Sequence, residues 1–212
     1  MANLKIYGIP KSRAVRVIWM AEELGLPYTV HAVDIGKDEQ FKPEFLKISP
    51  NNRIPAIVDR DNGQALFESG AILMYLAEKT GRFWPKEREP HWQTIQWLMW
   101  QMGGVGPMLG QVHHFVKYNK GKAPYAEERY LAEAKRLYGV LDKRLGEAEY
   151  LAGDYSIADM ATWPWISRYE WQTIDMTAYP NVLRWYKAIA VRPAVQRGYH
   201  VPIKQPEIPM PA

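Results

Sequence analysis

Cysteine is absent from all 212 residues of the chain. This absence excludes disulfide bonds, thiolate metal sites and any redox centre built from the protein's own thiols. Thiol chemistry would therefore need a thiol that a ligand brings. The chain also lacks an apolar run long enough to span a bilayer, and from its first residues we expect no signal peptide. We expect a cytoplasmic protein that does not bind membranes.

A large excess of one charge is missing too. The net charge is +4, and basic residues are spread over both halves of the chain. This distribution argues against nucleic-acid binding. The mild positive bias around Lys11, Arg13, Arg16 and Arg53 instead favours attraction of a small anion.

Residues 1–80 alternate between strand and helix patterns. The predicted strands cover residues 4–7, 28–33, 55–58 and 64–67. One predicted helix follows Ser12 as far as residue 24, and another covers residues 69–79. The opening strand–helix–strand unit implies a parallel pair with a right-handed crossover. The segment Asp61-Asn-Gly63 is typical of a hairpin turn. This order of elements predicts an α/β, thioredoxin-like N-terminal domain.

The second half of the chain is predicted to be all-α. Residues 81–90 hold two prolines and several charges, which indicates a linker. From there to residue 201, apolar residues follow helical spacing, so we place an all-α domain at residues 91–201. Residues 202–212 form a proline-rich tail that cannot continue a helix.

One helix start in the all-α domain has a clear signature. Ser156 and Asp159 have the spacing of a capping box, in which each side chain satisfies an N–H of the first turn. Tyr155 and Met160 lie at the spacing of a hydrophobic staple. We expect Asp159 to be structural.

Two short runs point to a ligand pocket, Ser49-Pro-Asn-Asn-Arg-Ile-Pro55 and Phe67-Glu-Ser-Gly70. A cis bond before Pro55 would free the N–H and C=O of Ile54 to pair with an extended peptide. Ser69 stands at the start of a helix, where backbone N–H groups attract a carboxylate, and Glu68 can receive an ammonium. Together they predict a pocket for a peptide with a free amino-acid end.

These two runs resemble the N-terminal domain of the cytosolic glutathione S-transferases. The resemblance extends to Tyr7-Gly-Ile-Pro-Lys-Ser-Arg-Ala14, Gln40-Phe-Lys-Pro-Glu-Phe45, Gly106-Pro-Met-Leu-Gly-Gln111, His113-His-Phe115 and Tyr155-Ser-Ile-Ala-Asp159. The middle and C-terminal motifs are most similar to the bacterial nu class, which is related to the yeast nitrogen-regulator prion protein. The N-terminal motif differs, because Lys11-Ser-Arg13 replaces the Thr-Pro-Asn segment of that class and is closer to serine-type transferases.

The resemblance implies glutathione as co-substrate, no metal, and a homodimer. The residues that it implies for glutathione binding are Gln40, Asn52, Arg53, Ile54, Pro55, Glu68, Ser69 and Arg129. A second-substrate pocket is expected around Met108, His113, His114 and Phe115. Neighbouring histidines point in different directions and have no acidic or cysteine partner nearby, so a metal reading of His113 and His114 is disfavoured.

Ser12 is the main catalytic candidate, with Arg13 beside it. Its hydroxyl either caps the following helix or donates a hydrogen bond to the glutathione thiolate. Arg13 and Lys11 either stabilise that thiolate or point into solvent. Given the two glutathione motifs, we favour the catalytic interpretation of Ser12.

The function implied first is glutathione conjugation to an electrophilic or apolar substrate, as in detoxification. One alternative is glutathione-dependent reduction of disulfides or peroxides, as in the nu class. Another is a non-catalytic regulatory or binding protein with the same fold. Retention of Ile54, Pro55, Glu68 and Ser69 argues against the last, because a scaffold alone needs no γ-glutamyl pocket.

Overall fold

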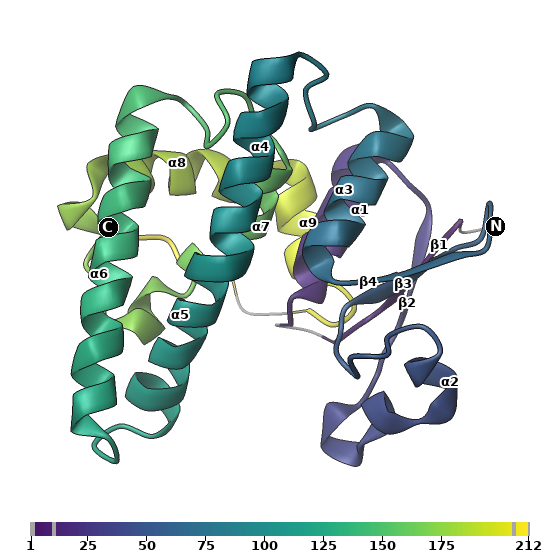
Figure 1. Cartoon of the computed structure of the whole chain (residues 1–212), viewed down its shortest axis with the longest axis horizontal. Helices are drawn as coiled ribbons and strands as arrows, with labels where there is room; N and C mark the ends of the chain where they lie inside the picture. The colour runs from purple at the N-terminus through teal and green to yellow at the C-terminus, as the bar shows by residue number, and fades with distance from the viewer. Residues whose placement is uncertain (1–2, 10–11, 205–206, 212) are drawn as a thin grey trace. The chain divides into compact units, whose positions relative to one another are not determined.

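The computed structural model describes residues 3–9, 12–204 and 207–211. The chain folds into two compact units (Figure 1). Unit 1 comprises residues 1–82 and 191–207, and unit 2 comprises residues 83–190 and 208–212.

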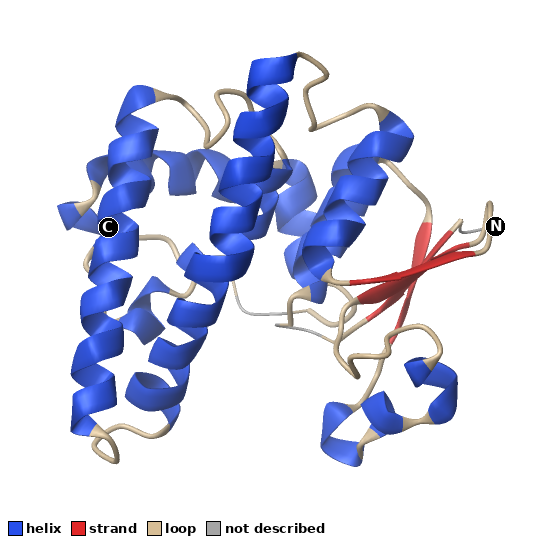
Figure 2. Ribbon diagram, in the orientation of Figure 1, coloured by secondary structure: helices blue, strands red, loops and turns tan. Residues whose placement is uncertain are grey.

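Unit 1 is built on a four-stranded mixed sheet (Figure 2). Its strands are β1 (Leu4–Tyr7), β2 (Tyr28–His31), β3 (Ala56–Asp59) and β4 (Gln64–Phe67), in the order β2-β1-β3-β4. The predicted parallel pair is confirmed, since β1 runs parallel to β2 and antiparallel to β3. Gly63 has a φ of 74°, so the β3–β4 hairpin uses the turn chemistry that the sequence indicates.

Helices cover both faces of this sheet (Figure 1). They are α1 (Ala14–Leu24), the short α2 (Pro43–Leu46) and α3 (Ser69–Thr80), while α9 (Pro193–Tyr199) packs on α1. Helices α1 and α3 pack together on one face, where Ile6, Ile57 and Leu73 are buried. On the other face, α2 brings Phe45 against Tyr7. The thioredoxin-like arrangement is therefore confirmed.

Helix α9 differs from its predicted place, because the sequence interpretation put it in the all-α domain and it packs on α1 within unit 1. Gly198 permits this approach, since a Cβ there would lie 3.0 Å from the Cα of Trp19. Arg192 also donates to both carboxylate oxygens of Glu23, at 2.6 and 3.0 Å. Such long-range packing leaves no local mark in the sequence.

Unit 2 is helical, as predicted. Its helices are α4 (Arg88–Trp100), α5 (Gly106–Val112), α6 (Pro124–Glu147), α7 (Ile157–Ile166) and α8 (Pro180–Ala190). Helix α4 starts inside the predicted linker 81–90, because Pro90 falls in the first turn, where proline is tolerated. Two π-helical segments, Gln101–Val105 and His113–Tyr118, flank α5. Among the described residues, no helix combines the length and apolar character needed to cross a membrane.

The capping box at the start of α7 forms as predicted. Asp159 accepts hydrogen bonds from the N–H of Ser156 at 3.0 Å and from that of Leu151 at 3.1 Å. The indole N–H of Trp185 donates to the same carboxylate at 2.8 Å. Asp159 is therefore a fully buried structural hub, and burial raises its pKa to about 6.

The proline-rich tail is only partly outside the described residues, at 205–206 and 212. Ile208 is buried in unit 2, and the carbonyl of Pro209 accepts a 2.6 Å hydrogen bond from the hydroxyl of Tyr186. The described residues of the tail are not helical, and residues 208–211 pack onto unit 2.

Candidate functional site

The loop before β3 holds the backbone of Ile54 open. The Ile54–Pro55 bond is cis, as the sequence predicts. The hydroxyl of Ser49, itself fully buried, donates to the carbonyl of Arg53 at 2.8 Å and fixes the loop. Neither the N–H nor the C=O of Ile54 bonds to another described residue. Both groups are therefore available to a peptide-like ligand.

The loop before α3 presents Glu68 and Ser69. Glu68 has a φ of 69° and a ψ of 113°, a region that non-glycine residues rarely occupy. Its carboxylate is exposed and makes no capping hydrogen bond to α3. Strained backbone of this kind persists where the surrounding structure enforces it, and it concentrates at functional sites. Helix capping alone does not explain Glu68.

Both loops line one cavity of about 170 Å³ in unit 1. Its lining residues are Arg13, Ser49, Asn51, Arg53, Ile54, Pro55, Phe67, Glu68 and Ser69. Six of the predicted site residues are thus brought together. Two guanidinium groups, those of Arg13 and Arg53, and the carboxylate of Glu68 give the cavity charges of both signs. It suits a zwitterionic ligand that carries additional carboxylates.

Arg16 was predicted only as part of a positive bias, and the structure ties it to this cavity. Its Nη1 donates a 3.0 Å hydrogen bond to Oγ of Ser69, which lines the cavity. The signal in the sequence was a charged residue inside the apolar run of α1, between Val15 and Val17. That run gave no indication of which side chain of another helix Arg16 would meet.

Two predicted glutathione residues of unit 1 do not line the cavity. The side-chain oxygen of Asn52 accepts from Arg53 at 2.6 Å, and Asn52 itself has a φ of 48°. Gln40 is buried, and its Oε1 has no hydrogen-bond partner in the described structure. An orphaned acceptor of this kind is unusual in a folded interior. A role for either residue in ligand binding stays a prediction.

Ser12 precedes α1, and its hydroxyl is engaged locally. It donates to the carbonyl of Ile9 at 2.7 Å and accepts from the N–H of Ala14 at 3.2 Å. The hydroxyl thus bonds to the first N–H of α1, although Arg13 and not Ser12 occupies the N-cap position. A donor role toward a thiolate requires the hydroxyl proton to leave Ile9, so it stays a prediction. Lys11, the other neighbour considered, lies outside the described residues.

In unit 2, Arg129 and Met108 line a second cavity, of about 700 Å³. It lies along α5 and α6 and also includes Tyr125, Glu128, Tyr130, Ala132, Glu133 and Arg136. Phe115 does not line it but stacks on Tyr130, with ring centroids 5.5 Å apart. The structure thus links three of the predicted residues to one region of unit 2.

The two histidines predicted for the second-substrate pocket differ. His114 is exposed, whereas His113 is buried between Trp165 and Trp171. The side chain of His113 lies 3.1 Å from Nε2 of Gln172, which donates to it. Burial, assisted by the charge of Arg168, lowers the pKa of His113 to about 4. His113 does not line the cavity of Arg129, and its place near a second substrate stays a prediction.

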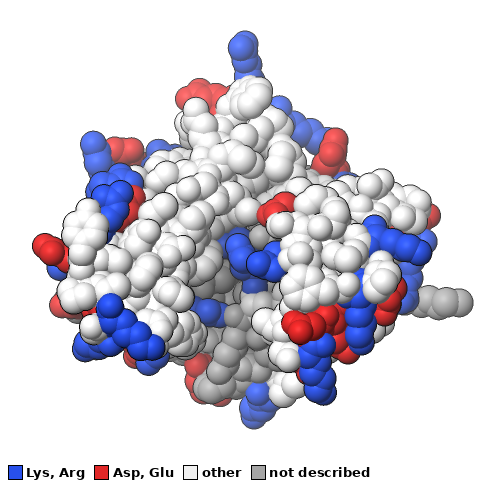
Figure 3. Space-filling view, turned by 60° about the horizontal axis from the view of Figure 1, so that its bottom comes forward, with Lys and Arg blue, Asp and Glu red and all other residues white. Residues whose placement is uncertain are grey.

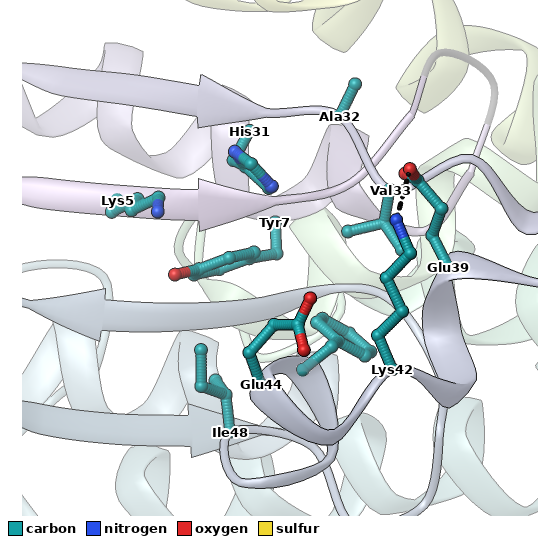
Figure 4. Close-up of a pocket in the computed structure, with 10 residues that line it drawn as sticks. Lys5, Tyr7, His31, Ala32, Val33, Glu39, Lys42, Glu44 and Ile48 are labelled. Atoms are coloured by element: carbon teal, nitrogen blue, oxygen red, sulfur yellow. Dashed lines mark hydrogen bonds and ion pairs between the residues drawn. The ribbon is translucent and has the colours of Figure 1, made fainter.

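Sequence reasoning missed a third cavity, of about 460 Å³, between α2 and the sheet of unit 1 (Figure 4). Tyr7 and Phe45 form its apolar floor, and Lys42 is paired with Glu39 at 2.9 Å. The ammonium of Lys5 lies 4.6 Å from the ring centroid of Tyr7. The cavity is lined by two lysines and two glutamates, and one lysine is already paired with a glutamate, so its charges favour neither an anion nor a cation.

On the face drawn in Figure 3, lysines and arginines are interspersed with acidic residues and form no continuous basic surface. No group of three potential metal-ligating side chains converges within residues 3–9, 12–204 and 207–211.

Both units match known family models. Residues 2–78 match the glutathione S-transferase N-terminal domain, and residues 124–188 match the glutathione S-transferase C-terminal domain. The disulfide-bond oxidoreductase YfcG of Escherichia coli is 51% identical over 197 residues, which cover 90% of this chain and 92% of that protein.

Solved structures of glutathione transferases are similar to this chain in fold and in sequence. A glutathione transferase from Pseudomonas putida, with one glutathione disulfide bound per subunit, has a TM-score of 0.88 and 42% identity, covering 95% of this chain and 92% of its own. One from Burkholderia graminis, with two glutathione molecules bound per subunit, has a TM-score of 0.87 and 44% identity, covering 95% of this chain and 89% of its own.

Proposed function

This chain belongs to the glutathione S-transferase family of enzymes, and from that premise we propose that it is a glutathione-dependent disulfide oxidoreductase. One observation carries the proposal. The open backbone of Ile54, the strained Glu68 and the buried Ser69 converge on one cavity in a chain that has no thiol of its own. The similarity to the oxidoreductase YfcG supports the disulfide as substrate.

Each part of glutathione has a complement in this cavity. Glu68 receives the ammonium of the γ-glutamyl group, and Ser69 with the first N–H groups of α3 receives its carboxylate. The N–H and C=O of Ile54 pair with the cysteinyl backbone in the manner of an added strand. Arg13 and Arg53 lie in the same lining and offer positive charge to the glycyl carboxylate and the thiolate.

The reaction then follows thiol–disulfide exchange. The bound glutathione thiolate attacks one sulfur of the substrate disulfide, forms a mixed disulfide and releases the other sulfur as a thiolate. A second glutathione thiolate attacks the mixed disulfide, releasing the remaining substrate thiolate and glutathione disulfide. Two glutathione molecules are oxidised for each disulfide reduced. The protein supplies binding, orientation and stabilisation of the first thiolate, and no residue of its own is oxidised.

Conjugation is the second candidate, and the position of Ser12 before α1 favours it. Once ligand is bound, we propose that the Ser12 hydroxyl turns from the carbonyl of Ile9 toward the thiolate, with Arg13 adding positive charge. A thiolate stabilised in this way attacks an electrophilic carbon as well as a sulfur. The two candidates therefore share the first site and differ in the second substrate.

The deciding experiment measures both reactions on one preparation. We expect reduction of a small disulfide by glutathione to have a higher kcat/KM than conjugation of a chlorinated nitrobenzene. Glu68→Ala should lower both, since it removes the contact with the γ-glutamyl ammonium. Conjugation with no detectable disulfide reduction would reverse the order of the two candidates. Absence of both, together with absence of glutathione binding, would contradict the proposal itself.

Several finer assignments belong to the same proposal. Membership of the nu class is proposed from the sequence motifs, a homodimer from the family, and a cytoplasmic location from the composition, with Gln40, Asn52 and Arg129 as further glutathione contacts. Met108, His113, His114 and Phe115 are proposed around the second substrate. Exposed Trp92 and Met99 lie seven residues apart on α4, which supports a face that a second copy covers. Sedimentation of the purified protein tests the dimer.

A further inference from the structure

Arg16 is among the most deeply buried side chains of unit 1, with 1% of its surface exposed. Its guanidinium stays ionised at every pH at which proteins fold. Burying such a charge costs free energy unless polar groups surround it. One of those groups is the hydroxyl of Ser69, which is 3% exposed and begins α3. Helix α1 thus sends a cation to the start of α3.

The chemistry of the two groups fixes the direction of this hydrogen bond. Arginine has donors only, so the oxygen of Ser69 must accept from Arg16. A serine hydroxyl also has one proton to donate. No other residue in the described part of the chain accepts that proton. Since Ser69 lines the cavity with Glu68, the proton is available to an acceptor inside the cavity.

We propose that Arg16 is a positioning residue that makes the site selective for the free α-carboxylate of a γ-glutamyl ligand, acting through Ser69. Arg16 holds the serine oxygen, so the proton faces the ligand, and a hydroxyl that accepts from a cation is a stronger donor. The first N–H groups of α3 and its positive end complete the carboxylate site. This inference rests on the proposed binding of glutathione, and it explains why the site would prefer a ligand that has the α-carboxylate.

The test compares two ligands by calorimetry. One is glutathione, and the other is the tripeptide in which γ-aminobutyryl replaces γ-glutamyl, so that only the α-carboxylate is missing. Arg16→Met should weaken the binding of glutathione by about tenfold to a hundredfold, as expected for a lost hydrogen bond that serves a charged group. It should leave the binding of the analogue within about twofold of wild type. Arg60→Met, which removes an exposed arginine that does not line the cavity, is the matched control.

A double-mutant cycle isolates the route through Ser69. In a Ser69→Ala background, Arg16→Met should change glutathione affinity by no more than about threefold, because the intermediate hydroxyl is gone. If Arg16→Met does not fold, Arg16→Lys takes its place in the same cycle, with a smaller loss of about threefold to tenfold that is still confined to glutathione.

Several outcomes would overturn the inference. Equal losses for glutathione and for the analogue would assign Arg16 a structural role only. An unchanged glutathione affinity in a folded variant, or an undiminished effect in the Ser69→Ala background, would also overturn it. If the wild-type protein binds glutathione, these results leave the proposed function intact. If the wild-type protein does not bind it, both ideas fail together.

Discussion

The polar groups around Asp159 in unit 2 and those at the cavity of unit 1 differ in how completely they are hydrogen-bonded. In unit 2, the carboxylate of Asp159 accepts from Leu151, Ser156 and Trp185. Likewise, the side-chain oxygen of Gln172 accepts a 2.7 Å hydrogen bond from the hydroxyl of Tyr138, and its nitrogen donates to His113. Hydrogen bonds within the unit thus occupy these groups, so its polar interior specifies packing.

At the cavity of unit 1, by contrast, some hydrogen-bond donors and acceptors have no partner among the described residues. The hydroxyl proton of Ser69 and the backbone groups of Ile54 find no acceptor or donor among the residues described. Glu68 keeps a strained backbone there. Buried polarity alone therefore does not identify a functional site. An unused donor or acceptor supports one only where it also lines a cavity, as Ser69 does, because the indole N–H of Trp84 in unit 2 is buried without a partner in the part of the chain that the structure describes and lines none of the three cavities described. The following substitutions test that contrast.

The largest effect is expected at Asp159. Asp159→Ala leaves buried N–H groups without an acceptor, and it should lower the free energy of unfolding by about 3–5 kcal/mol. Ser156→Ala removes one cap bond and should cost about 0.5–2 kcal/mol. Chemical denaturation measures both. Glutathione affinity at low temperature should stay at the wild-type value, and a large affinity loss in folded Asp159→Ala would place this residue in the site.

At Glu68, the effect should fall on binding. Glu68→Ala should weaken glutathione binding by about 2–4 kcal/mol, because the ligand's ammonium loses its partner once the ligand covers it. Glu68→Gly should lose as much affinity, yet be about 1 kcal/mol more stable than Glu68→Ala, since glycine adopts positive φ without strain. Calorimetry and denaturation on both variants check this. Equal stability of the two would show that Glu68 is not strained.

The contrast also predicts a pH dependence. The folded pKa of His113, lowered by burial to about 4, lies below its usual 6.5, so its stabilising contribution is present above pH 6.5 and lost as pH falls toward 4. The loss should be about 2–3 kcal/mol. His113→Gln cannot be protonated, so it should lose less stability than wild type over this range. Asp159 titrates in the opposite sense, and only the difference between the variants isolates His113.

Parallel slopes for wild type and His113→Gln between pH 4 and 6.5 would contradict this assignment. They would mean that His113 is protonated as readily in the folded protein as in the unfolded chain. Unfolding free energies at four or five pH values, measured at constant ionic strength, suffice for the comparison.

The sequence predicted the parts of the molecule that short segments determine. Ile54, Pro55, Glu68 and Ser69 lie in two loops whose local patterns specify a cis-proline turn and a helix start, and the structure brings them together. The roles of Arg16 and His113 depend on which helix faces meet. A single charged or aromatic residue in an apolar run does not encode that.

The same limit explains α9 and the unpredicted start of α4. The composition of α9 would suit a helix of either unit. It belongs to unit 1 because Gly198 lets it pack closely against Trp19 of α1. Pro90 marks a linker by composition, yet the first turn of a helix accepts it equally well.

The smallest effect is expected at Ser12, whose hydroxyl either keeps its local hydrogen bonds or donates to the bound thiolate. If its hydroxyl turns from the carbonyl of Ile9 to the thiolate, a neutral hydrogen bond of ~0.5–1.5 kcal/mol is exchanged for a charged one of ~1.5–3 kcal/mol. The net gain is about 1 kcal/mol, so Ser12→Ala should raise the pKa of the bound thiol by roughly 0.7 unit and leave glutathione affinity nearly unchanged. The pH–rate profile of conjugation measures this, and its thiol limb should move to higher pH. If the thiol limb does not move, Ser12 has only its local hydrogen bonds beside α1, and Arg13 or a backbone N–H stabilises the thiolate. The group that activates the thiol would then be a different one from the serine that the sequence favours.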